Sequence, residues 1–251
     1  GLFYIFSFVK FFIEKIELSL ILFRTINCLL LHQLVQYRHG PATFFPENID
    51  PNLCTHINYA FARLDNDVIV PYEWNDESTP WSIGLYARMI NIRKTKNIKI
   101  LLALGGWNHG SQSFSNMAQN ATRRARFIST TVQFLRKHLF DGLDLDWVMI
   151  LKTKTEENLS VSEIKFYYKE YPGSRQGSRP TDKQDYTQLL IELKRAFHPY
   201  NLLLTAAVAA GKSNIDRGYQ IKQVCQILDF VNVMSYDLHG FLSLLDHSFQ
   251  M

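Results

Sequence analysis

The chain has 251 residues, of which 47% are hydrophobic, 14% aromatic and 20% charged, with a formal net charge of +4. This length suits a single domain with a large buried core. The small positive charge is spread along the sequence instead of being clustered, which argues against a nucleic-acid-binding protein.

Residues 1–35 are apolar, but charged side chains such as Lys10, Glu14 and Arg24 interrupt them. The longest uncharged run is far shorter than the ~20 residues of a membrane-spanning helix. The segment also lacks the single apolar run and small-residue cleavage site of a signal peptide. Because the chain starts at Gly1, we interpret residues 1–35 as a mistranslated segment. A buried amphipathic helix and a membrane anchor are the second and third interpretations.

Short apolar runs alternate with longer helical patterns from residue 56 onward. The best candidate for a preceding strand is 28–31, although His32 and Gln33 follow it directly. The remaining predicted elements, in chain order, are a strand at 56–62, a helix at 80–95, strand 98–104, helix 121–139, strand 141–147, helix 182–198, strand 202–208, helix 214–227 and strand 229–236. Asn120 and Asp182 are predicted N-caps of two of these helices. This alternation predicts a parallel sheet covered by helices.

The predicted strand at 141–147 contains Asp141, Asp144 and Asp146 among apolar residues. Since strand side chains alternate between faces, Asp144 and Asp146 point the same way and Asp141 is out of phase. Two carboxylates this close raise at least one pKa, so that a proton can be held near neutral pH. Unpaired buried carboxylates are costly, and the pair therefore favours acid–base chemistry over a structural role. The next position on this face carries Val148.

A glutamate in a suitable setting occurs later, at Glu170. Joining Trp147 directly to Glu170 gives FDGLDLDWEYPGSR, which closely resembles the active-site signature of the family 18 glycoside hydrolases, the chitinases and chitinase-like proteins. Further segments similar to this family follow in the family's order, at 37–38, 44–51, 54–62, 101–107, 205–208 and 234–240.

The resemblance implies an α/β fold, the (β/α)8 TIM barrel. We expect an incomplete barrel at 36–240, with about six of the eight strands, followed by a tail at 241–251 that does not match the family. Residues 148–169 split the signature. They begin with valine, whose codons start with GT, and end with lysine, one of whose codons ends in AG. We interpret them as a retained intron, the alternative being a genuine inserted loop at the mouth of the barrel, where insertions are tolerated.

The resemblance also implies a substrate-assisted retaining mechanism, in which the substrate's own N-acetyl oxygen attacks the anomeric carbon. It makes Glu170 the general acid and Asp146 the carboxylate that binds the acetamido N–H. Asp144 would share the proton of Asp146 deeper in the barrel, and Asp141 would support the start of the strand. Tyr236 would hold the acetamido oxygen in its attacking position.

Other residues are expected to line the substrate site. By resemblance, Met234 and Asp237 line the acetamido pocket, and Trp107, Tyr59 and Phe61 are candidates for a floor on which sugar faces stack. A core role is an equal alternative for Tyr59 and Phe61. Trp107 follows two glycines, which allow close backbone approach at a strand end and favour a site role.

Cys28 and Cys54 correspond to two cysteines that relatives join, so the resemblance implies a Cys28–Cys54 disulfide and a secreted protein. The N-glycosylation sequons Asn120-Ala121-Thr122 and Asn158-Leu159-Ser160 matter only if the chain is exported.

The expected function is a secreted, monomeric chitinase that cleaves β-1,4-linked N-acetylglucosamine polymers. Its partners would be chitin or chitooligosaccharides, with no cofactor, metal ion, nucleic acid or membrane. Because residues 148–169 displace Glu170, we expect impaired catalysis. The alternatives are a catalytically inactive chitin-binding lectin and a nonfunctional fragment. A glutamate two residues after Asp146 in the spliced product would favour the enzyme, and a valine the lectin.

Overall fold

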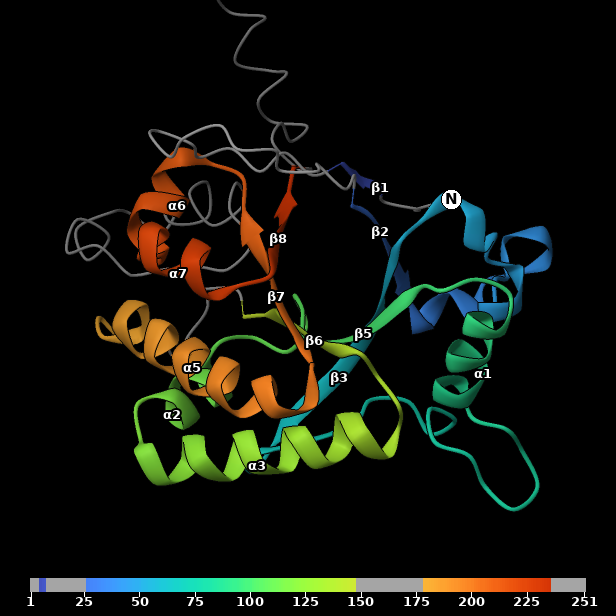
Figure 1. Cartoon of the computed structure of the whole chain (residues 1–251), viewed down its shortest axis with the longest axis horizontal. Helices are drawn as coiled ribbons and strands as arrows, with labels where there is room; N and C mark the ends of the chain where they lie inside the picture. Colours follow the sequence, from blue (N-terminus) through green and yellow to red (C-terminus); the bar gives the residue numbers. More distant parts are fainter. Residues whose placement is uncertain (1–4, 8–25, 148–177, 236–251) are drawn as a thin grey trace, which may run out of the picture.

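The computed structural model describes residues 5–7, 26–147 and 178–235. The other ranges are drawn as a grey trace in Figure 1. The sequence predictions for Glu170, Tyr236 and Asp237, for the segment 148–169 and for the tail 241–251 therefore lie outside the described residues.

One curved sheet forms the centre of the molecule, with helices around its outer side (Figure 1). Its main path runs through β1 (Ile5–Ser7), β2 (Asn27–His32), β3 (His56–Asp65), β5 (Lys99–Gly105), β6 (Gly142–Asp146), β7 (Leu203–Ala209) and β8 (Phe230–Met234). β1 pairs antiparallel with β2, and β4 (Val68–Pro71) pairs antiparallel with β3. The six strands from β2 to β8 on this path pair in parallel and curl into part of a barrel. The expected incomplete (β/α)8 barrel is therefore confirmed.

The helices are α1 (Leu85–Asn91), α2 (Gln112–Ala118), α3 (Ala121–Lys137), α5 (Asp182–Phe197), α6 (Lys212–Gly218) and α7 (Ile221–Ile227). Short 3-10 turns lie at η1 (Gln33–Tyr37), η2 (Gly40–Ala42), η3 (Pro46–Asn48), η4 (Pro51–Leu53), η5 (Ile92–Lys94) and η7 (His198–Tyr200). The long predicted helices at 121–139 and 182–198 correspond to α3 and α5. The predicted helix at 214–227 is divided into α6 and α7, and the one at 80–95 begins only at Leu85.

The two predicted N-caps have different outcomes. Asn120 caps α3 as expected, because its Oδ1 accepts hydrogen bonds from the backbone N–H groups of Thr122 at 3.0 Å and Arg123 at 3.1 Å. Asp182 is instead the first residue of α5, and the N-cap position belongs to Thr181. The Asp182 carboxylate accepts bonds from the Ser115 hydroxyl and the backbone N–H of Arg179, so it joins α5 to α2.

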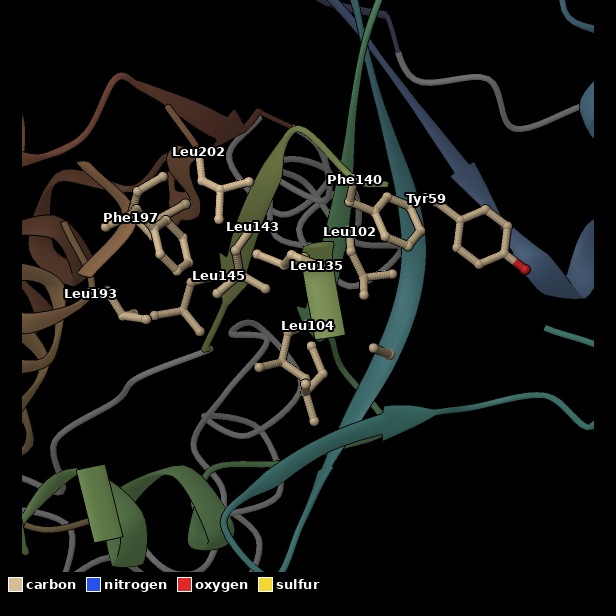
Figure 2. Packing of buried hydrophobic residues seen from close by; sticks show 14 of the residues in the cluster. Tyr59, Leu102, Leu104, Leu135, Phe140, Leu143, Leu145, Leu193, Phe197 and Leu202 are labelled. Carbon is tan, nitrogen blue, oxygen red and sulfur yellow. The ribbon is translucent and has the colours of Figure 1, made fainter. Parts of the chain in front are cut away.

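Alternation along β6 separates an apolar face from an acidic face. Leu143 and Leu145 are fully buried and pack in the layer between sheet and helices, together with Leu135 and Phe197 (Figure 2). Burial of each such side chain stabilises the fold by about 1.5–3 kcal/mol. Asp144 lies between the two leucines and consequently points to the barrel interior.

The predicted Cys28–Cys54 disulfide is wrong for this structure, in which both residues are buried free thiols. The parallel register places Cys28 opposite His56, two residues beyond Cys54. Such an offset corresponds to a Cα separation of about 8 Å, whereas a disulfide requires about 4.4–6.8 Å. Among the residues that the structure describes, no helix has the length and apolarity needed to cross a membrane.

Candidate active site

Asp144 lies inside the barrel, with side chains from three other strands around it. Its Oδ1 accepts hydrogen bonds from the Thr205 hydroxyl of β7 at 2.5 Å and from the Asn232 amide of β8 at 2.7 Å. The amide of Asn58, on β3, is a third donor to the same carboxylate. Asp144 is only 1% exposed. Asp146 lies two residues further toward the end of β6, on the same face of the strand, and is 7% exposed.

The two carboxylates differ in the support that they receive. Burial raises the pKa of Asp144 to about 6, although the three hydrogen bonds favour its ionised form. Burial and the neighbouring Asp144 raise the pKa of Asp146 to about 7. Asp146 Oδ1 is buried without a partner among the described residues. The pair therefore holds a proton into the neutral range, and Asp146 is the member that ionises last.

Two glycines bring the loop after β5 against the end of β6. Gly105 and Gly106 have φ angles of +114° and +79°, which favour glycine. A Cβ on Gly105 would lie 2.3 Å from the backbone oxygen of Asp146, and the Gly106 N–H donates to the same oxygen at 3.0 Å. Trp107 follows these glycines directly and is 51% exposed. The backbone that leads into Trp107 therefore lies against the C-terminal end of β6, where Asp146 is located.

Phe61 belongs to the same region, since a Cβ on Gly106 would lie 2.8 Å from its ring. Its ring also packs edge-on against His32, with 5.4 Å between the ring centroids. Phe61 is partly exposed in the middle of β3. Its ring therefore lies against the backbone of Gly106, which leads from the C-terminal end of β5 into Trp107.

Tyr59 is not part of this group. It follows Asn58, which faces Asp144, and alternation therefore directs Tyr59 to the helix side of the sheet (Figure 2). Its ring is 0% exposed and packs edge-on against Tyr86. Its hydroxyl donates to Asp76 Oδ1 at 2.5 Å. Of the two roles considered from the sequence, this placement favours the core role.

Asp141 lies at the other end of β6, about 16 Å along the strand from Asp146. Its carboxylate accepts hydrogen bonds from Arg93, from Lys99 at 3.2 Å and from the backbone N–H of Ile100 at 2.8 Å. It therefore ties the start of β6 to β5 and to η5, the 3-10 turn after α1, and it does not join the Asp144–Asp146 pair.

The sequence model described as "Glycosyl hydrolases family 18" matches residues 32–248, well over half of the chain. The chain belongs to glycoside hydrolase family 18. Mouse chitotriosidase-1 is 40% identical over 216 residues, a match that covers 82% of this chain and 40% of the mouse protein. The chain thus spans less than half of the length of this relative.

Solved structures of the family support the same assignment. An immunomodulatory active chitinase from Trichuris suis matches with a TM-score of 0.69 and 35% identity, over 85% of this chain and 51% of that one. Human YKL-39 matches with a TM-score of 0.66 and 34% identity, over 85% and 51% respectively. YKL-39 is described as a pseudo-chitinase with retained chitooligosaccharide binding properties.

Sequence reasoning overlooked the three donors to Asp144, namely Asn58, Thr205 and Asn232. Each is a polar residue at an inward position of an otherwise apolar strand, which is the signal that could have identified them. Met234, which sequence reasoning included, is partly buried at the end of β8, two residues after Asn232 and so on the same face.

Proposed function

We propose that this chain is a chitinase-type glycoside hydrolase, which cleaves β-1,4-linked N-acetylglucosamine polymers by substrate-assisted retaining catalysis. The observation that carries the proposal is the buried Asp144–Asp146 pair at the C-terminal end of β6. Barrel enzymes place their catalytic groups at this end of the strands. The similarity to mouse chitotriosidase-1 supports the same substrate class.

In the proposed mechanism, the acetamido N–H of the substrate donates to ionised Asp146, while its acetamido oxygen attacks the anomeric carbon. Asp144 accepts the proton that Asp146 releases, and the donors Thr205, Asn232 and Asn58 prepare Asp144 for that exchange. Because the pKa values of the two carboxylates are about 6 and about 7, the transfer costs little free energy.

Glu170 would protonate the leaving glycosidic oxygen, Tyr236 would hold the acetamido oxygen, and Met234 and Asp237 would line its pocket. Trp107 and Phe61 would supply the aromatic faces for the sugar rings. A general acid must be held within about 0.5 Å of its working position. Residues 148–169 separate Glu170 from Trp147, so we infer that catalysis is impaired in the chain that contains them.

Sequencing cDNA across the codons for Trp147 and Glu170 tests the retained-intron interpretation. A product that lacks the codons for 148–169 places Glu170 directly after Trp147 and restores the acid. If every product contains these codons, the interpretation as an enzyme is wrong, and the chain is a binding protein without catalysis.

The second candidate function is a chitin-binding lectin without hydrolysis. It is favoured by Val148, which stands where the acid is expected. Human YKL-39, with its retained chitooligosaccharide binding, is a structural neighbour. Under either function, the partner is chitin or a chitooligosaccharide, and the protein is an extracellular monomer acting in chitin turnover, with no nucleic-acid or membrane partner.

Binding calorimetry with chitohexaose tests the site that both functions share. Trp107→Ala removes the exposed ring that is proposed to stack on a sugar, and it should weaken binding at least tenfold, because stacking of an aromatic face is lost. Trp81→Ala is the matched control, since Trp81 is 89% exposed and lies in the segment between β4 and α1, which is not part of the proposed site. Cellohexaose, which lacks acetamido groups, should not bind measurably. Equal affinity of the two tryptophan variants, or equal affinity for the two sugars, would refute the proposed site.

A further inference from the structure

Asn120 lies at the junction of α2 and α3, in the helix layer outside the sheet (Figure 1). It is the first residue of the sequon Asn120-Ala121-Thr122, and residues 119–122 are all exposed. The second sequon, at Asn158, lies outside the described residues. Of the two sequons, the structure therefore describes the surroundings of Asn120 alone.

The cap of α3 uses only one of the two polar atoms of the Asn120 side chain. Oδ1 accepts from the backbone N–H groups of Thr122 and Arg123. Nδ2 has no hydrogen bond to a described residue, and the residue is exposed. A substituent on Nδ2 thus leaves the capping bonds of the helix intact.

The neighbouring side chains leave the surface around Asn120 open. Arg123 is held by Asp67 at 2.7 Å, and Arg124 is held by Glu192 at 2.9 Å. Both guanidinium groups are therefore directed to partners on other elements. The sequon's hydroxyl residue, Thr122, is exposed.

We propose that Asn120 is an N-glycosylation site whose glycan is carried on the capping residue of α3. The reaction joins Nδ2 to C1 of the reducing-end N-acetylglucosamine of a lipid-linked oligosaccharide. The bond between C1 and the pyrophosphate oxygen breaks, the lipid pyrophosphate leaves, and Nδ2 loses one proton. In the native cell this modification rests on the export that forms part of the proposed function.

Asparagine is also a preferred N-cap without any glycan, and the test must separate the two roles. Asn120→Asp keeps a capping oxygen and removes the acceptor nitrogen. Thr122→Ala destroys the sequon and leaves the Asn120 cap in place. Asn158→Gln, as the background for both changes, removes the second sequon.

The experiment expresses the chain behind a heterologous leader in a secreting eukaryotic cell, so that entry into the lumen does not depend on native export. Both medium and lysate are analysed by peptide mass mapping, before and after peptide N-glycosidase treatment in ¹⁸O water. We expect the Asn158→Gln chain to carry a glycan at Asn120, and either Asn120→Asp or Thr122→Ala to abolish it completely.

An unmodified Asn120 in the lumenal Asn158→Gln chain would overturn the proposal. So would a glycan that persists in Thr122→Ala. Neither readout depends on chitin binding or cleavage, so failure of the glycan proposal and failure of the proposed function are observed separately.

Discussion

Asp144 and Asp146 share a face of one strand, yet their different hydrogen-bond donors give them different roles. Asp144 accepts bonds from Thr205, Asn232 and Asn58, whereas Asp146 Oδ1 has no partner among the described residues. Donors to a carboxylate favour its ionised form, which keeps Asp144 ready to take a proton from Asp146.

Removing one of these donors should change the titration of the pair without removing a carboxylate. Thr205→Val deletes the hydroxyl that donates to Asp144 and retains the shape of the side chain. We expect the pKa of Asp144 to rise by about one unit, because a hydrogen bond to a charged group contributes about 1.5–3 kcal/mol. Carboxyl ¹³C shifts of labelled aspartate, followed against pH, measure this change.

Thr205→Ser is the matched control, since it keeps the hydroxyl, and its titration should follow that of the unaltered chain. If Thr205→Val folds and titrates as the unaltered chain does, the assigned role of Thr205 is wrong.

The raised pKa values also predict how stability depends on pH. Both carboxyls titrate above their ordinary value of 3.8, at about 6 and about 7 in the folded chain. The folded state therefore binds more protons than the unfolded state in this window. Their stabilising contribution is fully present below pH 3.8 and is lost as pH rises through 6 and 7.

Asp146→Asn should remove part of this loss. The test compares the free energy of unfolding of the unaltered chain with that of Asp146→Asn at each pH. The value for the unaltered chain minus the value for the variant should fall by at least about 1.4 kcal/mol between pH 5 and pH 8. The subtraction cancels the contribution of the partly buried histidines His56 and His109, whose pKa values are lowered by desolvation. Urea unfolding at both pH values measures the difference, and a constant or increasing difference would show that the pair is not protonated as described.

At the level of secondary-structure elements, carboxylates also hold the N-terminal ends of neighbouring strands. Asp141 accepts from the backbone N–H of Ile100, at the start of β5, and Asp229 accepts from the backbone N–H of Leu204, at the start of β7. Each also pairs with a lysine, Lys99 and Lys194 respectively. This end of the sheet therefore carries carboxylates that stabilise the fold, and the opposite end carries the Asp144–Asp146 pair for which catalysis is proposed.

Asp141→Ala should accordingly lower stability and leave binding unchanged. We expect a loss of about 1.5–3 kcal/mol, because a partly buried acceptor of charged and backbone donors is removed. Asp216→Ala is the control, since its bond to Lys212 lies on the surface and should contribute less than about 1 kcal/mol. Urea unfolding and chitohexaose calorimetry provide the two readouts. Weaker binding by a folded Asp141→Ala chain would place Asp141 in the site after all.

Local patterns predicted the six parallel strands, the long helices α3 and α5 and the central pair, but not β1, β4 or α2. Contacts between distant segments could not be read from local patterns. Alternation alone placed Asp144 and Asp146 on one buried face. Thr205 and Asn232 reach Asp144 across 61 and 88 positions of sequence, so only the strand order reveals their role. The Cys28–Cys54 disulfide was implied by the family resemblance, and the observed register, which pairs Cys28 with His56, does not bring the two cysteines together.

The whole molecule brings these features together as part of a family 18 barrel, in which six parallel strands place the carboxylate pair in the interior and the Gly105–Gly106 turn against the end of β6. Arg179, just before α5, and Asp182, its first residue, attach this helix to α2. The Arg179 guanidinium donates a hydrogen bond to the Ser115 hydroxyl, which in turn donates to the Asp182 carboxylate. This attachment does not depend on the length of the preceding segment, so removal of 148–169 should leave the described fold intact. Circular dichroism and the urea midpoint of the shortened chain check this expectation, and loss of cooperative unfolding would contradict it.

The measurement that bears most directly on the proposed glycosidase is the rate of chitotetraose hydrolysis by the unaltered chain and by the chain shortened by 148–169. The shortened chain, with Glu170 directly after Trp147, should cleave at least about 100-fold faster, since a positioned general acid contributes about 10²–10⁴-fold. Glu170→Gln in the shortened chain should return the rate to background. A folded shortened chain that binds chitotetraose without cleaving it, or a Glu170→Gln variant that remains active, would contradict the account.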